Sequence, residues 1–546
     1  MTLAPNAESQ RVTQARSMVI TRGGIVAAES PLAAQAAVQV LARGGSAVDA
    51  AIAANAVMGV VSPMMNGIGG DLFAIVYDAK SGRRYGINAS GWAPRGLTPE
   101  FLRAHGMEKM PGAGIHAVTV PGAVEGWLKL HERFGKRPLA EDLAAAVRIA
   151  EEGAPVTEWV AVYWEGAVQT HWLAGDPAAQ KLYLPEGRAP HVGEIFRNPE
   201  LAASLRRIAA AGHDGFYRGD TAQKILATEQ RFGGVMTADD LAEFSAEWVE
   251  PISTTYRGWT VYEMPPNGQG IAALMMLNIA ENFPLEVMGH NSADSLHVLI
   301  EAKKLAYADM FRNVADPKFA QVPVGAMLAK DYAKKRAAQI DLARANCEVS
   351  AGLPSAGDTT YLATVDKDGN EVSLIQSNYS EFGSGIVAEG AGFVLQNRGA
   401  LFTLDGQSPN VLAARKRPLH TIIPAQMEKG DVRIAFGIMG GWNQSQAHAQ
   451  FVVNVVDYGM NIQAALEAAR FTKRTSAGCD VDIESRVPPE ARGALEAKGH
   501  KVAVLTPYAA LVGGGQAVMR DFSTGVNYGA SDPRKDGAAV PEPLPQ

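Results

Sequence analysis

Small apolar residues recur at helical spacing over residues 31–42, and Gly44-Gly45 follows as a stop signal. A second, more apolar helix is predicted from Ser46, whose hydroxyl can cap the first free N–H groups. Its stretch 48–61 is interrupted by Asp49 and Asn55, so we expect a buried helix rather than a membrane span. Apolar runs at 72–77 and 84–87 flank the turn residues 80–82, which predicts a hairpin.

The middle of the chain, residues 139–336, is predicted to be mostly helical, because each apolar stripe lies beside charged positions. Residues 346–358 carry few large apolar side chains and are expected to form an exposed loop. A strand, an Asp-Gly turn and a second strand follow at 359–365, 366–370 and 371–376. Further strands are predicted at 392–396, 420–423, 432–436 and 517–520, helices at 445–458 and 462–469, and a disordered Pro-rich tail at 536–546. The pattern favours an α+β fold with antiparallel sheets.

Composition narrows the function. With 546 residues and 47% hydrophobic residues the chain is globular, and its 50 basic against 57 acidic residues give a charge of −7, which makes a nucleic-acid partner unexpected. The two cysteines, Cys347 and Cys479, are too few for a disulfide framework or a thiolate zinc cluster. Residues 1–16 lack the apolar core of a secretory signal. We therefore expect no membrane partner and a cytoplasmic location, or a periplasmic one if a leader was removed.

Common catalytic motifs are missing. No phosphate loop occurs, Gly383-Ser-Gly385 is too short for a dinucleotide fingerprint, and Phe382 replaces the first glycine of a nucleophile elbow. His-Glu-x-x-His is also absent. No cofactor or metal is expected, although histidines far apart in sequence could converge on a metal in the fold.

The Asp358-Thr359 junction offers a nucleophile. A threonine hydroxyl needs a base, and the α-amine of a chain that begins with that threonine can supply it near neutral pH. A Gly/Ser/Pro-rich loop that ends at Thr359-Thr360 is a place where cleavage could expose such an amine. The plain alternative is that two β-branched residues simply begin a strand.

Several motifs in order resemble the γ-glutamyltransferase family. The small-subunit motifs are residues 359–370, 382–386, Asn397, 416–419, Gly440-Gly441 and 528–534, and the large-subunit motifs are 67–70, 120–124 and 265–268. The resemblance implies an N-terminal-nucleophile hydrolase with a four-layer αββα core. It also implies a precursor cleaved between Asp358 and Thr359 into fragments 1–358 and 359–546, which share one structural domain as a heterodimer or as a pair of such heterodimers.

The resemblance also implies roles for individual residues. Thr359 would form an acyl-enzyme, and Gly440 and Gly441 would supply the oxyanion hole, unless they form only a tight turn. Ser377 falls where the family has a threonine that supports the nucleophile, and a solvent-facing strand serine is the alternative.

The expected glutamyl-binding residues are replaced. Ser90 stands at the position of the family's carboxylate-binding Arg, and Leu401 at that of the acidic residue that holds the α-amine. Tyr379 replaces an Asn, and His420-Thr421 replaces a Ser-Ser pair. A zwitterionic glutamyl head therefore loses both of its expected counter-charges.

Arg398, beside Asn397, supplies a different cation. We hypothesise that it grips the carboxylate of an acyl group without an α-amine, as in glutaryl-cephalosporin acylases or oxamate amidohydrolases; a structural salt bridge is an equal alternative. His420 would orient substrate or water, or is a core residue. The expected function is hydrolysis of an amide of a small carboxylate-bearing substrate. A true γ-glutamyltransferase or glutathione hydrolase and an unprocessed, non-catalytic binding protein are the alternatives.

Overall fold

Two seven-stranded antiparallel sheets form the centre of the molecule. A computed structural model describes residues 14–349, 358–475 and 477–544. Sheet I has the order β1 (Val19–Thr21), β20 (Val526–Ser531), β19 (Gly515–Asp521), β15 (Val432–Ile438), β14 (Ala425–Lys429), β9 (Trp259–Glu263) and β8 (Ile252–Tyr256). Sheet II has the order β21 (Ala538–Pro541), β2 (Ile25–Ala28), β10 (Asp358–Val365), β11 (Glu371–Tyr379), β3 (Asp71–Asp78), β4 (Arg83–Ala89) and β7 (Glu247–Val249).

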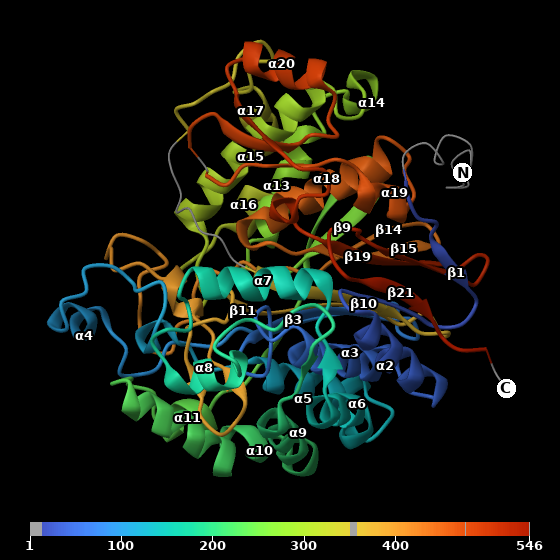
Figure 1. The fold of residues 1–546 in the computed structure, drawn as a ribbon. Coiled ribbons are helices and arrows are strands. Elements are labelled where there is room, and N and C mark those ends of the chain that lie inside the picture. Colours follow the sequence, from blue (N-terminus) through green and yellow to red (C-terminus); the bar gives the residue numbers. More distant parts are fainter. Residues whose placement is uncertain (1–13, 350–357, 476, 545–546) are drawn as a thin grey trace.

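The sheets pack face to face, and helices cover both outer faces (Figure 1). Phe73, Ile75 and Ile375 of sheet II meet Ala435 and Val518 of sheet I in a buried apolar layer. Sheet II is covered by α2 (Pro31–Ala42), α3 (Ala47–Val61), α5 (Ala123–Phe134) and α6 (Leu139–Glu152), with α9 (Pro199–Ala211), α10 (His213–Tyr217) and α11 (Gly219–Arg231) beyond them. Sheet I is covered by α13 (Gly270–Ala280), α15 (Ala293–Asn313), α18 (Gln444–Val456) and α19 (Ile462–Glu467). The predicted four-layer αββα arrangement is confirmed.

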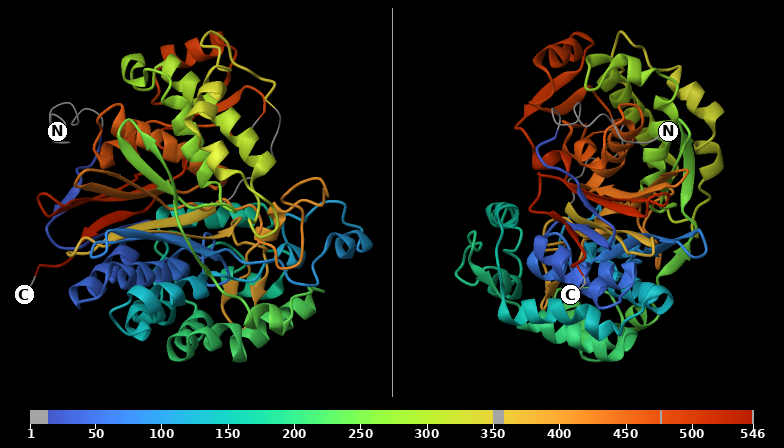
Figure 2. Two further views of the ribbon diagram at one scale, coloured as in Figure 1. Left: turned by 180° about the vertical axis from the view of Figure 1, so that it is seen from behind. Right: turned by 90° about the vertical axis from the view of Figure 1, so that its right-hand side faces the viewer.

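Smaller elements surround the four layers (Figure 2). The remaining helices are α4 (Pro99–Ala104), α7 (Glu158–Gln169), α8 (Pro177–Tyr183), α12 (Ala238–Ala242), α14 (Leu285–Met288), α16 (Val324–Met327), α17 (Lys330–Ala337) and α20 (Pro489–Ala497), with short 3₁₀ turns at η1 (Ile115–Ala117), η2 (Arg398–Leu401), η3 (Gly441–Asn443) and η4 (Ala510–Val512). The remaining strands are β5 (Ala154–Pro155), β6 (Ile195–Phe196), β12 (Val387–Ala388), β13 (Phe393–Val394), β16 (Phe471–Thr472), β17 (Asp480–Glu484) and β18 (Lys501–Leu505). Among the described residues, no helix combines the length and apolarity that a membrane crossing requires.

Local signals placed several elements correctly. Ser46 caps α3 in a reciprocal capping box with Asp49, and the helix that follows is buried almost throughout. The hairpins β3–β4 and β10–β11 both form where the turn residues predicted them. Helices α18 and α19 match their predicted spans to within three residues at each end.

Two predictions from the pattern were wrong, and two others were incomplete. Residues 420–423 form no strand, because Ile422 and Ile423 donate their N–H groups to the His420 and Gln444 side chains and the run becomes a buried loop. The tail is not disordered at 538–541, where β21 pairs with β2 along the edge of sheet II. The middle region is mostly helical, as predicted, and also contains the β8–β9 hairpin. Strand β13 covers only two residues of the predicted 392–396.

Strands from both sides of residue 358 alternate within each sheet. In sheet II, β10 and β11 lie between β2 and β3, and in sheet I, the four strands β20, β19, β15 and β14 lie between β1 and β9. Neither portion of the chain can therefore complete a sheet without the other. The predicted exposed loop falls largely outside the described residues, since residues 350–357 are not among them.

Candidate active site

Thr359 lies at the start of β10, at an irregularity in its pairing with β11. Asp358 pairs with Tyr379 and Thr360 with Gln376, so two steps on β10 face three on β11. Thr359 is 1% exposed. Such bulges redirect side chains beside functional sites, and this one brings Thr359 opposite Ser377.

Two polar side chains contact the Thr359 hydroxyl. Thr359 Oγ1 lies 3.3 Å from Ser377 Oγ, and Gln444 Nε2 donates to Thr359 Oγ1 across 3.4 Å. Ser377 is buried, and its Oγ also accepts the N–H of Tyr379 at 2.8 Å. Ser377 therefore faces the threonine rather than solvent. Neither a hydroxyl nor a carboxamide takes up a proton at neutral pH, so these two contacts position the oxygen without activating it.

Gly440 and Gly441 form the turn between β15 and α18. Their φ angles are 122° and 56°, a region that favours glycine. The Gly441 carbonyl accepts a 2.8 Å hydrogen bond from Gln269, and Tyr307 holds the Trp442 carbonyl. In the described part of the chain, the backbone N–H groups of both glycines are unused.

The turn leads directly to the nucleophile. Gln444, the first residue of α18, is the residue that contacts Thr359 Oγ1. The first residue of α18 thus contacts the threonine, and the glycine turn immediately precedes this helix start, which favours a negatively charged oxygen.

Arg398 is fully buried and lies against Tyr379, which pairs with Asp358 beside Thr359. Its Nη1 donates to Thr421 Oγ1 at 2.6 Å, and its guanidinium stacks 4.7 Å above the Tyr379 ring. Asp71 Oδ2 lies 3.8 Å from Arg398 Nε, outside hydrogen-bond distance. Arg398 Nε and Nη2 have no hydrogen-bond partner among the described residues. Burial lowers the pKa of Arg398 to about 10, which leaves it charged at neutral pH.

His420 pairs with Asp71 on the adjacent strand β3. His420 Nε2 donates to Asp71 Oδ2 at 2.8 Å, and His420 Nδ1 accepts the Ile422 N–H. Burial, with the nearby Arg398, lowers the pKa of His420 to about 4, so the ring is neutral. Both ring nitrogens are therefore engaged within the protein. Asp71 Oδ1 also accepts bonds from Gly91 N and Gln396 Nε2.

Two other predicted binding residues have structural partners. Asn397 donates to the Gly112 carbonyl at 2.7 Å and accepts the Ser380 N–H at 3.0 Å, which ties two loops together. Ser90 is completely buried, and its Oγ accepts a bond from Asn267. Asn397 and Ser90, which the sequence suggested as substrate-binding residues, therefore form hydrogen bonds within the protein.

A cavity of about 720 Å³ adjoins the glycine turn. Gly440, Trp442 and Asn443 form one side, and Trp172 and Leu511 contribute apolar surface elsewhere in its lining. Within the described structure, both side-chain amide atoms of Asn443 are buried without a hydrogen-bond partner. The volume and the apolar lining of the cavity can accommodate a bulky group.

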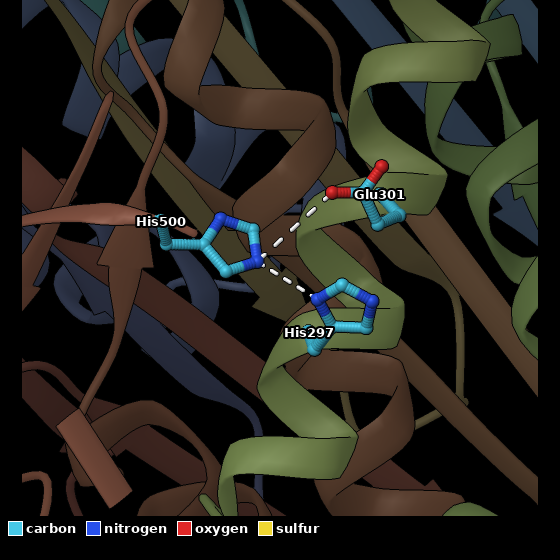
Figure 3. Close-up of side chains that lie close together, drawn as sticks. All are labelled: His297, Glu301 and His500. Carbon is cyan, nitrogen blue, oxygen red and sulfur yellow. Dashed lines mark hydrogen bonds and ion pairs between the residues drawn. The ribbon is translucent and has the colours of Figure 1, made fainter. Parts of the chain in front are cut away.

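A histidine cluster is formed by α15 and the residue before β18 (Figure 3). His297 on α15 and His500 share a 2.8 Å hydrogen bond, and His500 Nε2 lies 4.0 Å from Glu301. His297 Nε2 bonds to the Asp341 carbonyl, and Lys304 donates to Glu301. Because a divalent ion would have to displace the Lys304 ammonium, the arrangement favours a structural network over a metal site.

Sequence reasoning missed Gln444, Gln269 and Asp71. Asp71 directly follows the glycine-rich segment 67–70 that carried part of the resemblance, so its position was a usable signal. Gln444 lies three residues after Gly441, and a polar residue at a helix start beside a glycine turn was a usable signal for a site residue. Gln269 gave no separate signal.

Known proteins are similar over nearly the whole chain. A family model described as gamma-glutamyltranspeptidase matches residues 33–542. The chain is 38% identical over 514 residues to the glutathione hydrolase-like YwrD proenzyme of Bacillus subtilis (strain 168), covering 93% of this chain and 96% of that protein. It is 34% identical over 531 residues to the oxamate amidohydrolase proenzyme of Klebsiella pneumoniae, covering 95% and 99% respectively.

Solved structures agree with the fold. The crystal structure of cephalosporin acylase from Bacillus halodurans matches with a TM-score of 0.90 and 43% identity, over 96% of this chain and 97% of that one. The family resemblance and the αββα fold predicted from the sequence are confirmed.

Proposed function

The chain belongs to the gamma-glutamyltranspeptidase family, and from this premise we propose that Thr359 is its nucleophile and that its acyl substrates carry a carboxylate but no α-amine. The protein is a self-processing N-terminal-nucleophile amide hydrolase. The substrate class and the residue roles that follow are our proposal.

Processing begins when Thr359 Oγ1 attacks the carbonyl carbon of Asp358. The peptide bond shifts to an ester on the threonine oxygen, and water then cleaves that ester to leave a carboxylate on residue 358 and a free amine on Thr359. That amine, with a reference pKa near 7.7–8.0, removes the hydroxyl proton in each later turnover. Ser377 and Gln444 hold the oxygen in place through both reactions.

Substrate hydrolysis repeats the same chemistry. Thr359 attacks the amide carbonyl, the amine product leaves with a proton, and water releases the acid from the acyl-enzyme. The N–H groups of Gly440 and Gly441 stabilise the oxyanion in each tetrahedral intermediate. Because Gln269 and Tyr307 already fix the turn carbonyls, the donors need no rearrangement when charge develops.

The proposed substrate class rests on the two donors, Nε and Nη2, of the Arg398 guanidinium that are unpaired among the described residues. Nε and Nη2 lie on the same edge of the guanidinium, and both lack a partner in the described structure. A carboxylate can accept both hydrogens at once, which satisfies two buried donors and a buried charge. Asp71 only partly offsets that charge, since it lies 3.8 Å from Nε.

The position expected to bind an α-amine offers no anion. Leu401 is 4% exposed and apolar, so an ammonium placed beside it would be buried without a partner. His420 is neutral and fully bonded, and we assign it the role of fixing Asp71 beside Arg398.

The cavity beside Gly440 is where we place the leaving amine. Its volume of about 720 Å³ far exceeds what ammonia requires, and its tryptophan and leucine side chains suit a bulky organic amine. This supports an acylase over an enzyme that releases ammonia.

Two matched substrates test the proposal. Glutaryl-p-nitroanilide and γ-glutamyl-p-nitroanilide differ only in the α-amine, so their kcat/KM ratio reports whether that amine is recognised. We expect the glutaryl compound to be favoured by at least about a hundredfold, the cost of burying one unpaired ammonium. A preference for the glutamyl compound would instead establish a true γ-glutamyltransferase or glutathione hydrolase.

A further inference from the structure

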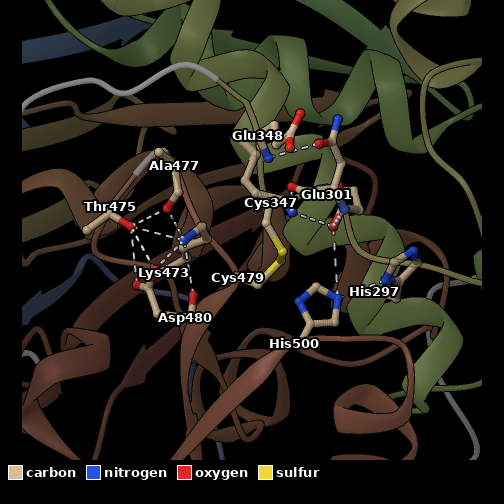
Figure 4. The surroundings of a disulfide bond; sticks show 12 residues. His297, Glu301, Cys347, Glu348, Lys473, Thr475, Ala477, Cys479, Asp480 and His500 are labelled. Carbon is tan, nitrogen blue, oxygen red and sulfur yellow. Dashed lines mark hydrogen bonds and ion pairs between the residues drawn. A yellow bond between two sulfur atoms is a disulfide. The ribbon is translucent and has the colours of Figure 1, made fainter.

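The chain's two cysteines form a disulfide that spans the proposed cleavage point. Cys347 precedes residue 358 and Cys479 follows it, 132 positions further along the chain (Figure 4). Their Cα atoms are 5.0 Å apart, within the usual range of about 4.4–6.8 Å. The cysteine count excluded a disulfide framework, but it left room for this single bond.

Two hydrogen bonds across the same boundary, and one within the part before residue 358, hold both sides of the disulfide. Gly478 donates its N–H to the Cys347 carbonyl at 3.1 Å. Lys304 donates to the Asn346 carbonyl at 2.6 Å, next to Cys347. Further along, the N–H of Ala345 reaches the Lys498 carbonyl at 2.7 Å.

Buried charge fixes this region from the core side. Lys303 on α15 is 1% exposed and donates to the Thr475 carbonyl at 2.7 Å. Lys473 donates to the Ala477 carbonyl at 2.8 Å and lies 3.0 Å from Asp480 Oδ1. Moving these buried amines would leave the carbonyl groups that they contact without partners, so these contacts hold the segment beside Cys479 against α15.

We propose that this disulfide is the covalent link between the two fragments of the mature enzyme, an inference that rests on the proposed cleavage at Asp358-Thr359. Its formation removes two protons and two electrons from the thiols, and a disulfide-bearing oxidant takes them up and becomes two thiols. Before cleavage the bond closes a loop within one chain. After cleavage it joins two chains that would otherwise be held by noncovalent contacts alone.

The link changes how the mature enzyme unfolds and refolds. Two unlinked fragments separate on unfolding and must meet again by diffusion, so refolding slows with dilution. Linked fragments stay at a fixed effective concentration, and refolding is then independent of protein concentration. The disulfide thus restores to the cleaved enzyme the single-molecule folding of its precursor.

The proposal also bears on location. Cys347 is exposed and Cys479 is buried, so the bond joins a surface segment to the interior. Disulfides of this kind persist in oxidising compartments and are rare in the reducing cytosol. Of the two locations considered from the sequence, this favours one outside the cytosol.

Gel electrophoresis of the purified mature protein, with free thiols blocked by N-ethylmaleimide, tests the link. Without reductant we expect one denatured species of full-length mass, and with dithiothreitol two species that correspond to residues 1–358 and 359–546. Two fragments in the absence of reductant would overturn the link while leaving the proposed cleavage intact. One full-length species in both lanes would overturn the cleavage, and with it the link.

A variant with both Cys347→Ser and Cys479→Ser tests the consequence. After denaturant is diluted away, its recovery of activity should slow about tenfold for each tenfold dilution of protein, whereas the parent enzyme recovers at one rate. The same two substitutions in the uncleaved Thr359→Ala background serve as the control, followed by circular dichroism, and should refold at a rate that dilution leaves unchanged. Recovery that is independent of concentration in the cleaved variant would refute the proposal.

Discussion

Replacing Arg398 by methionine removes the buried fork while keeping a side chain of similar length. Arg398 is fully buried, and two of its donors, Nε and Nη2, form no hydrogen bond with any described residue. Removing one partner of a buried charge pair costs about 3–5 kcal/mol. We take the lower end, because Asp71 already offsets part of the charge at 3.8 Å. About 3 kcal/mol corresponds to a loss of roughly 150-fold in kcat/KM for a carboxylate-bearing acyl group.

The assay compares two p-nitroanilides with five-carbon acyl groups. Glutaryl-p-nitroanilide carries the terminal carboxylate and valeryl-p-nitroanilide does not, so only the first should lose the full factor in Arg398→Met. Arg398→Lys keeps the charge but not the fork, and should give an intermediate loss on the glutaryl compound. Processing is checked for every variant on a reducing gel, because an uncleaved protein would be inactive for another reason.

The result that refutes this reasoning is an equal loss on both substrates. Such a loss would mean that Arg398 supports the fold through Thr421 and Tyr379, as the structural alternative holds. An unchanged glutaryl rate in a fully processed variant would be equally decisive, because the carboxylate would then bind elsewhere.

Three further predictions address other parts of the molecule. Gly440→Ala places a side chain at φ 122° and should lower kcat by at least about a hundredfold. The matched control is Gly459→Ala, at φ 63° in an exposed turn, which should leave kcat unchanged. Ser377→Ala should lower kcat about tenfold, because it removes one hydrogen bond to Thr359. Ser377→Thr restores a hydroxyl and should recover most of the lost kcat. A rise in KM with an unchanged kcat would contradict the role assigned to Ser377. Burial raises the pKa of Glu371 to about 8, so the folded protein keeps a proton that the unfolded chain loses above about pH 4.5, and stability falls as the pH rises between these values. Glu371→Gln should therefore leave Tm unchanged near pH 4.5 and raise it at pH 8, and equal shifts at both values in thermal scans would disprove this linkage.

Local backbone preference explains what the sequence predicted well. The capping pair Ser46 and Asp49, and the Asp-Gly turn before Glu371, act within a few residues, so the helix and the hairpin follow from their own segments. The wrong assignments have the opposite character. Residues 538–541 form a strand only because the edge of β2 is available for pairing. Residues 420–423 do not form the predicted strand, because side chains accept their N–H groups.

The site shows the same division. The sequence identified Thr359, the glycine turn and Arg398 as single positions, through motifs and departures from them. It gave no sign that Gln444 contacts the threonine, that His420 is neutral and bonded to Asp71, or that two donors of Arg398 are left unpaired. Each of these depends on which strands lie side by side.

By itself, then, the sequence determined the family, the succession of helices and strands, and the residue types able to carry the chemistry. The tertiary structure alone decided which of those residues meet, which are already satisfied by protein partners, and that Cys347 pairs with Cys479. The physical reason is that hydrogen bonding, burial and disulfide formation act between atoms a few ångströms apart. Here those atoms belong to segments separated by tens to hundreds of residues, which only the packing of the two sheets brings together.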